Sequence, residues 1–164
     1  MSLMPLLMAP LAVQIHASCA IAAFVIGAIV LWRRKGTRLH RALGRIWVLL
    51  MLVVATSAIF INDLRIIGPF SPIHIFVIVT YVGLGKGLWA IIVDHDVVVH
   101  RAAMQSTYLG ALLLAGAFTF LPGRRMHAVL FGANAGWLPS LLLIGTVLAI
   151  TAVVWVRLTP RRVG

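Results

Sequence analysis

Residues 11–32, with the sequence LAVQIHASCAIAAFVIGAIVLW, decide the fold, because this apolar run contains no charged residue and is long enough to span a bilayer. Across 164 residues, 62% are apolar and 10% are charged, whereas soluble domains carry about 25% charged residues. The sequence therefore predicts an all-α integral membrane protein with about five transmembrane helices in a single domain, 1–164. The predicted helices lie near 11–32, 42–62, 72–93, 101–121 and 138–156.

Basic residues predict how the chain is oriented in the membrane. The connection between the first two spans is crowded with Arg33, Arg34, Lys35, Arg38, Arg41 and Arg45. The next connection carries only Arg65. Because basic residues concentrate in cytoplasmic loops, we expect the N-terminus outside and the C-terminus in the cytoplasm. The net charge of +11 follows this pattern, so we expect the lipid bilayer as a partner and no nucleic acid.

The first ten residues, MSLMPLLMAP, lack the basic segment of a signal peptide, so we expect the first apolar run to be retained as a helix. A weak internal repeat then links the first four spans. His16 precedes Gly27 by eleven residues, as His74 precedes Gly85, and His-Arg-Ala recurs at 40–42 and 100–102. The repeat predicts a bundle of two similar hairpins, followed by a fifth helix. Segment 123–137 is expected to be an outer loop or a short interfacial helix.

Histidines are the main chemical signal, because ionisable groups inside a membrane are costly and usually functional. In the predicted topology His16 and His74 lie in the outer part of the bundle, and His40 and His100 lie at its cytoplasmic end. A b-type haem needs two facing imidazoles, which alternate helices of a bundle can supply. We therefore expect one or two b-type haems, with iron held by His16 and His74 and by His40 and His100.

Two other functions use the same residues. In a non-redox protein, such as a small transporter or a membrane assembly subunit, the histidines would pack, anchor or relay protons. In a metal-dependent hydrolase, Asp96 and His100 would join His40 around zinc or iron, with Asp94 as the general base.

The remaining polar residues have a structural and a functional interpretation. Lys86 either extends toward the inner membrane surface or receives an anionic electron donor or a haem propionate. Arg124 belongs to an outer polar cluster with Arg65, Arg125 and His127, where arginine anchors the chain at the interface or clamps a propionate or lipid phosphate. The tryptophans are expected near the helix ends, in aromatic belts. They are Trp32, Trp47, Trp89, Trp137 and Trp155.

Four motifs resemble a bacterial membrane protein family labelled domain of unknown function 2306. They are KGTRLHRALGRIW at 35–47, SPIH at 71–74, HRAAM at 100–104 and PGRRMH at 122–127. The resemblance covers nearly the whole chain and implies a small multi-pass protein of the bacterial inner membrane. It supplies histidine motifs at positions 40, 74, 100 and 127, and no reaction.

More distantly, the chain resembles transmembrane b-type di-haem cytochromes, although these commonly have six helices. That resemblance implies an outer haem on His16 and His74, an inner haem on His40 and His100, and Lys86 near the inner donor site. Any enzymatic activity would then be that of a membrane oxidoreductase or electron-transfer subunit, with a donor and an acceptor that the sequence does not identify. The small residues Ala20, Ala23 and Gly27 are also compatible with a homodimer.

Overall fold

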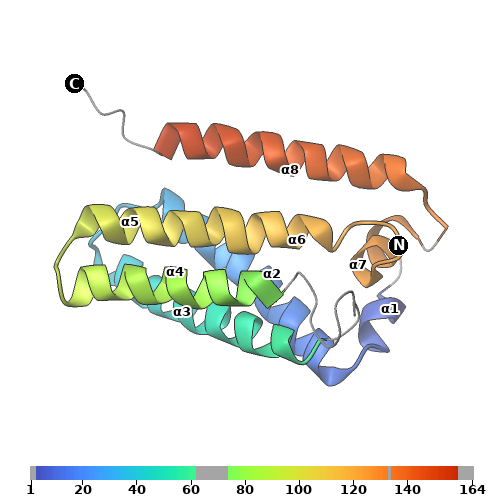
Figure 1. Cartoon of the computed structure of the whole chain (residues 1–164), viewed down its shortest axis with the longest axis horizontal. Helices are drawn as coiled ribbons and strands as arrows, with labels where there is room; N and C mark the ends of the chain where they lie inside the picture. Colours follow the sequence, from blue (N-terminus) through green and yellow to red (C-terminus); the bar gives the residue numbers. More distant parts are fainter. Residues whose placement is uncertain (1–2, 62–73, 133, 159–164) are drawn as a thin grey trace. The chain divides into compact units, whose positions relative to one another are not determined.

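The computed structural model describes residues 3–61, 74–132 and 134–158, and within these ranges it is helical without any strand (Figure 1). This confirms the predicted all-α class. The elements are α1 (Met4–Leu7), α2 (Leu11–Trp32), α3 (Arg38–Ile59), α4 (His74–Ile92), α5 (Val97–Ser106), η1 (Thr107–Leu114), α6 (Ala115–Phe118), α7 (Arg125–Phe131) and α8 (Trp137–Leu158).

Four helices in the described ranges are long and apolar enough to cross a membrane, namely α2, α3, α4 and α8. The predicted span near 101–121 instead consists of α5, the π-helix η1 and α6. A π-helix has wider turns than an α-helix and is often found at functional positions. The predicted set of about five spans therefore corresponds to four uninterrupted α-helices and one run that contains π-helical turns.

Local capping sets where the helices begin. α3 begins at Arg38, four residues before the predicted start, because the Thr37 hydroxyl accepts a hydrogen bond from the His40 amide at 3.1 Å. α5 begins at Val97 because Asp96 Oδ1 accepts hydrogen bonds from the amides of the second and third helical residues, each at 2.9 Å. As a result, both His40 and His100 lie close to the first turn of a helix.

By its internal contacts the chain divides into two compact units, Ala9–Leu112 and Met1–Met8 with Leu113–Gly164. In the first unit, α2 packs on α3 and α4 packs on α5, and α3 also packs on α4. This confirms the predicted bundle of two hairpins. In the second unit, α1 contacts α7 and α6 contacts α8. Organisation as one domain stays a prediction.

Aromatic side chains fill part of the interior of the first unit. Trp47 and Tyr108 are each 4% exposed, and Tyr108 donates a hydrogen bond to the Phe24 carbonyl at 3.0 Å. A Cβ at Gly27 would lie 2.5 Å from the Tyr108 ring and 2.6 Å from Trp47 Nε1, so only glycine fits there. These contacts join α2, α3 and η1. The expectation that Trp47 lies in an interfacial belt is therefore wrong, because its ring packs inside the bundle.

Candidate functional site

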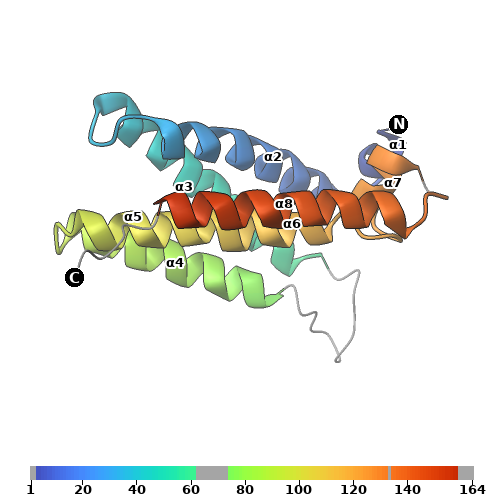
Figure 2. The same ribbon diagram turned by 90° about the horizontal axis from the view of Figure 1, so that it is seen from above.

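The α2–α3 turn and the α4–α5 turn lie at the same end of the Ala9–Leu112 unit (Figures 1 and 2). We call this the basic end, because Lys35, Arg41 and Arg101 lie in or beside these turns. His40 from α3 and His100 from α5 are close enough here to interact electrostatically. The predicted inner pair thus has one histidine from each hairpin at this end, and the ligation of one metal ion by both rings stays a prediction.

A backbone hydrogen bond orients the ring of His100. Its Nδ1 lies 2.8 Å from the carbonyl oxygen of Gly87 in α4. A carbonyl only accepts, so Nδ1 carries a hydrogen and donates it. In the neutral ring Nε2 then keeps its lone pair, which is the arrangement commonly found in metal-binding histidines.

The ring of His40 has a different environment. Its Nδ1 is buried and makes no hydrogen bond to any described residue. A buried polar atom without a partner costs about 1–3 kcal/mol, so a ligand that used this ring would recover part of that free energy. One turn further along α3, a Cβ on Gly44 would meet no atom within 4 Å. The pair therefore consists of an oriented imidazole and an unpartnered one, and each is of a chemical type that can ligate a metal.

Lys35 is anchored at the basic end by backbone carbonyls. Lys35 Nζ donates hydrogen bonds to the carbonyls of Leu31 and, at 2.9 Å, Arg33. Burial of the ammonium, and secondly the positive charge of Arg101, lower the pKa of Lys35. Asp96 uses its carboxylate to cap α5, and no ion pair joins the described basic side chains of this end to an acidic one. Asp94 and Asp96 of the α4–α5 turn lie at the same end, so it carries charges of both signs with cations in excess.

Of the predicted outer pair, His16 and His74, the structure describes the side chain of His16 only. His16 Nδ1 lies 3.0 Å from the Val54 carbonyl and 3.2 Å from Ser57 Oγ, both in α3. Because Ser57 donates its own hydrogen to the Val53 carbonyl at 2.6 Å, the His16 Nδ1–H is the donor in this group. The side chain of His74 lies outside the described residues, so the pairing of His16 with His74 stays a prediction.

Two other predicted groups are not assembled around the histidine pair. Lys86 is exposed on α4, whose buried positions include Thr80 and Leu84, so its predicted cofactor contact stays a prediction. Among the described residues, no group of three or more histidine, cysteine, aspartate or glutamate side chains is placed to hold a metal. The zinc site expected from Asp96, His100 and His40 is therefore not formed.

The residues of the predicted outer polar cluster lie in different environments. Arg124 is the N-cap residue of α7, and Arg65 lies outside the described residues. His127 is only 1% exposed, so the expectation that it belongs to an interfacial cluster is wrong. Its Nε2 lies 3.0 Å from the Ala135 carbonyl and its Nδ1 lies 2.8 Å from Ser140 Oγ.

Ser140 continues this network by donating a hydrogen bond to the Phe120 carbonyl at 2.6 Å, and the edge of the His127 ring packs on Phe131. These bonds connect the turn after α6, the helix α7, the loop that follows it and the first turns of α8. The buried ring therefore holds the segment 120–140 together.

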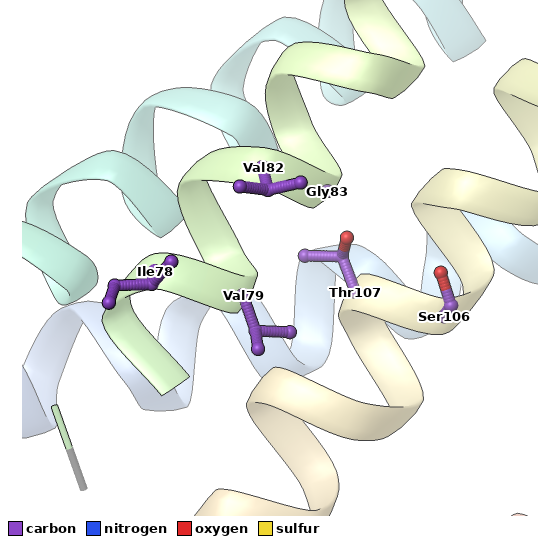
Figure 3. Close-up of a pocket in the computed structure, with 6 residues that line it drawn as sticks. All are labelled: Ile78, Val79, Val82, Gly83, Ser106 and Thr107. Carbon is purple, nitrogen blue, oxygen red and sulfur yellow. The ribbon is translucent and has the colours of Figure 1, made fainter. Parts of the chain in front are cut away.

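A groove of about 300 Å³ lies on α4 and the junction of α5 with η1 (Figure 3). Its lining is mostly apolar, with two hydroxyl groups from Ser106 and Thr107. Both hydroxyls donate to the Ala103 carbonyl, at 3.0 and 2.8 Å. The groove thus offers no charged group or metal ligand, and it differs in chemistry from the basic end.

The carbonyl partner of His100, Gly87, was missed by reasoning on the sequence. A signal for it exists, because Gly87 precedes His100 by thirteen residues and Gly27 precedes His40 by the same number. The structure breaks this symmetry, since His40 Nδ1 has no partner whereas His100 Nδ1 has one.

Comparison with known protein families gives a match over most of the chain. The model of a family described as "Predicted membrane protein (DUF2306)" matches residues 13–148. No curated protein and no solved structure matches the chain.

Proposed function

Because the chain belongs to the DUF2306 family of predicted membrane proteins, whose description names no reaction, we propose a function from the site itself: electron transfer across a membrane by a b-type haem protein. The proposal places the haem iron between His40 and His100. The observation that carries it is the position of these two imidazoles at the same end of the bundle, on different hairpins (Figure 1), with the His100 ring oriented through Nδ1 by a backbone carbonyl. When bound, a haem supplies reversible one-electron chemistry between ferric and ferrous iron.

The chain's own residues have three tasks in this proposal. The Gly87 carbonyl fixes the tautomer and direction of the His100 ring. Thr37 begins α3 early enough to include His40 in its first turn. Trp47 and Tyr108 pack tightly inside the same bundle and exclude water from its interior.

We extend the proposal to a second haem on His16 and His74. The hydrogen bond from His16 Nδ1 to the Val54 carbonyl leaves Nε2 as the acceptor nitrogen, as the Gly87 carbonyl does for His100. We also propose that the protein lies in the bacterial inner membrane with its basic end in the cytoplasm, because basic residues concentrate there.

An absorption spectrum tests the proposal. The protein is expressed with haem precursor, purified in detergent and measured oxidised and dithionite-reduced. We expect sharp b-type bands that weaken in both His40→Ala and His100→Ala. The control is His95→Asn, which changes an exposed histidine near His100 whose φ of 54° asparagine tolerates.

A colourless protein, despite ample haem supply, would overturn the haem proposal. It would leave the non-redox alternative, in which the histidines act as structural groups or proton relays. Equal loss of the bands in His95→Asn would also count against the assignment, because the effect would then not be specific to the pair.

A further inference from the structure

Three arginines share the face of α3 that points away from the bundle. Arg38, Arg41 and Arg45 are all exposed, and spacings of three and four residues place them one above another on a helix. Trp47 and Met51, which are buried residues of the same helix, lie on its opposite side. We call the three residues the arginine face. Their side chains therefore face the surroundings of the protein rather than its interior.

The arginine face lies within the length that α3 needs to cross a membrane. After Arg45, the mostly apolar residues 46–59 extend about 21 Å at 1.5 Å per residue, whereas the hydrocarbon core of a bilayer is about 30 Å thick. The backbone at Arg45 therefore falls inside the core, and its long side chain extends toward the lipid headgroups. A guanidinium at this level is costly unless it reaches a polar or anionic partner.

The same side of α3 continues into exposed apolar side chains. Leu49 follows Arg45 by one turn and is 63% exposed, and Val53 follows one turn later at 41%. A phospholipid presents its groups in the same order, with a phosphate at the membrane surface and acyl chains in the core. The surface therefore matches one lipid lying along α3.

The arginines have donors available for phosphate oxygens. Arg41 Nη1 donates a hydrogen bond to the Gly36 carbonyl at 2.8 Å, which holds this side chain beside the α2–α3 turn. Gly36 has a φ of 78°, a conformation that glycine adopts without strain. A guanidinium has five N–H donors, and paired hydrogen bonds to phosphate are a geometry that arginine favours. Arg41 can therefore bind a phosphate without giving up its contact with the turn.

Acidic residues at this end leave positive charge in excess. Asp94 and Asp96 lie in the α4–α5 turn, and Asp96 uses Oδ1 to cap α5. Both aspartates belong to the other hairpin. Residues 1–62 contain no aspartate or glutamate, whereas segment 33–45 contains five arginines and one lysine. A cluster of about four to eight basic residues beside a membrane-spanning helix is typical of a site for anionic lipid.

We propose that the arginine face binds the headgroup phosphate of an anionic phospholipid, such as phosphatidylglycerol, while Leu49 and Val53 contact its acyl chain. The bound lipid fixes the depth of α3 in the membrane. Phosphatidylcholine binds more weakly, because its choline cation is repelled by the excess of arginines. The proposal goes beyond electron transfer and does not depend on haem, since the arginine face lies outside the bundle.

The test is a lipid titration of the full chain in detergent, in which native mass spectrometry counts the lipids bound. The probes are phosphatidylglycerol and phosphatidylcholine with the same acyl chains. We expect Arg38→Gln/Arg45→Gln to raise the Kd for phosphatidylglycerol about tenfold, as for loss of two exposed ion pairs. This variant retains Arg41 and its hydrogen bond to the turn.

Two further variants make the result specific. Arg34→Gln/Arg101→Gln removes the same amount of charge from exposed positions at the same end but outside the arginine face, so we expect the wild-type Kd. Arg38→Lys/Arg45→Lys keeps the charge but loses the paired hydrogen bonds, so we expect it to recover part of the affinity. Haem absorption should be the same in all variants.

Four results would overturn the proposal. The first is an unchanged Kd in Arg38→Gln/Arg45→Gln, and the second is an equal loss in Arg34→Gln/Arg101→Gln, which would indicate a general attraction between charges. The third is equal affinity of wild type for the two lipids. The fourth is displacement of phosphatidylglycerol by inorganic phosphate at the same concentration, which would show that the acyl chain contributes nothing.

Discussion

The buried histidine of the second unit and the histidine pair of the first differ in what their ring nitrogens still have to offer. His127 places both nitrogens within hydrogen-bond distance of protein oxygens and is 1% exposed. His100 uses one nitrogen on Gly87, and His40 has a buried nitrogen with no partner. A ring whose two nitrogens both face protein oxygens has none left for a ligand, whereas a ring with an open nitrogen can bind one.

This comparison teaches that a count of histidines in an apolar sequence does not separate structural from functional ones. Both His100 and His127 belong to motifs with adjacent arginines. The neighbours that distinguish them, Gly87 on one side and Ser140 with Ala135 on the other, are reached only through the fold.

The largest effect is expected from His127→Leu. The substitution removes the buried ring that faces Ser140 and leaves the Ala135 carbonyl without its His127 partner, so we expect a loss of about 2–4 kcal/mol in the free energy of unfolding. Unfolding in mixed detergent–SDS micelles measures it. The haem bands per folded molecule should stay the same. Loss of these bands would show that His127 also supports haem binding, which would contradict its assignment as a structural histidine.

A somewhat smaller loss is expected from Gly27→Ala. The new Cβ would lie 2.5 Å from Tyr108, and the overpacking should cost about 1–3 kcal/mol. Gly85→Ala is the matched control, because a Cβ there meets no atom within 4 Å and alanine favours helix. Equal stability of both variants would show that the aromatic rings beside Gly27 can shift enough to accommodate an added methyl group.

The opposite sign is expected from His40→Leu in the apo-protein. It removes a buried nitrogen that has no partner, so the apo-protein should gain about 1 kcal/mol while losing haem. The same unfolding assay, on protein prepared without haem, provides the measurement. A loss as large as that of His127→Leu would mean that the His40 ring is a structural group.

The smallest effect is expected from Thr37→Ala, which removes the cap of α3 and should cost about 1 kcal/mol. Because fraying of the first turn also displaces His40, haem affinity should fall together with stability. Thr56→Ala is a suitable control, since that hydroxyl lies outside the first turn of α3 and bonds to Leu52 and Tyr81. Unchanged haem affinity in Thr37→Ala would show that the cap does not position the site.

Reasoning on the sequence placed the apolar helices well because the cost of exposing backbone polar groups to lipid leaves few alternatives to long helices. The placement of His40 and His100 at the same end of two hairpins followed from the repeat, and their pairing around one iron stays a prediction. The sequence predicted the environments of single side chains less accurately than it predicted the helices. Trp47 and His127 both lie near the ends of apolar runs, where sequence position favours an interfacial role, yet both are buried.

The sequence by itself determined the membrane-protein class, the order of the helices and the concentration of positive charge at one end, because these depend on composition and on short-range periodicity. Only the tertiary structure decided which ring nitrogens have partners and which tryptophan faces inward. Those properties depend on contacts between residues far apart in the chain, such as Gly87 with His100 and Trp47 with Tyr108, and they arise only when the helices pack together.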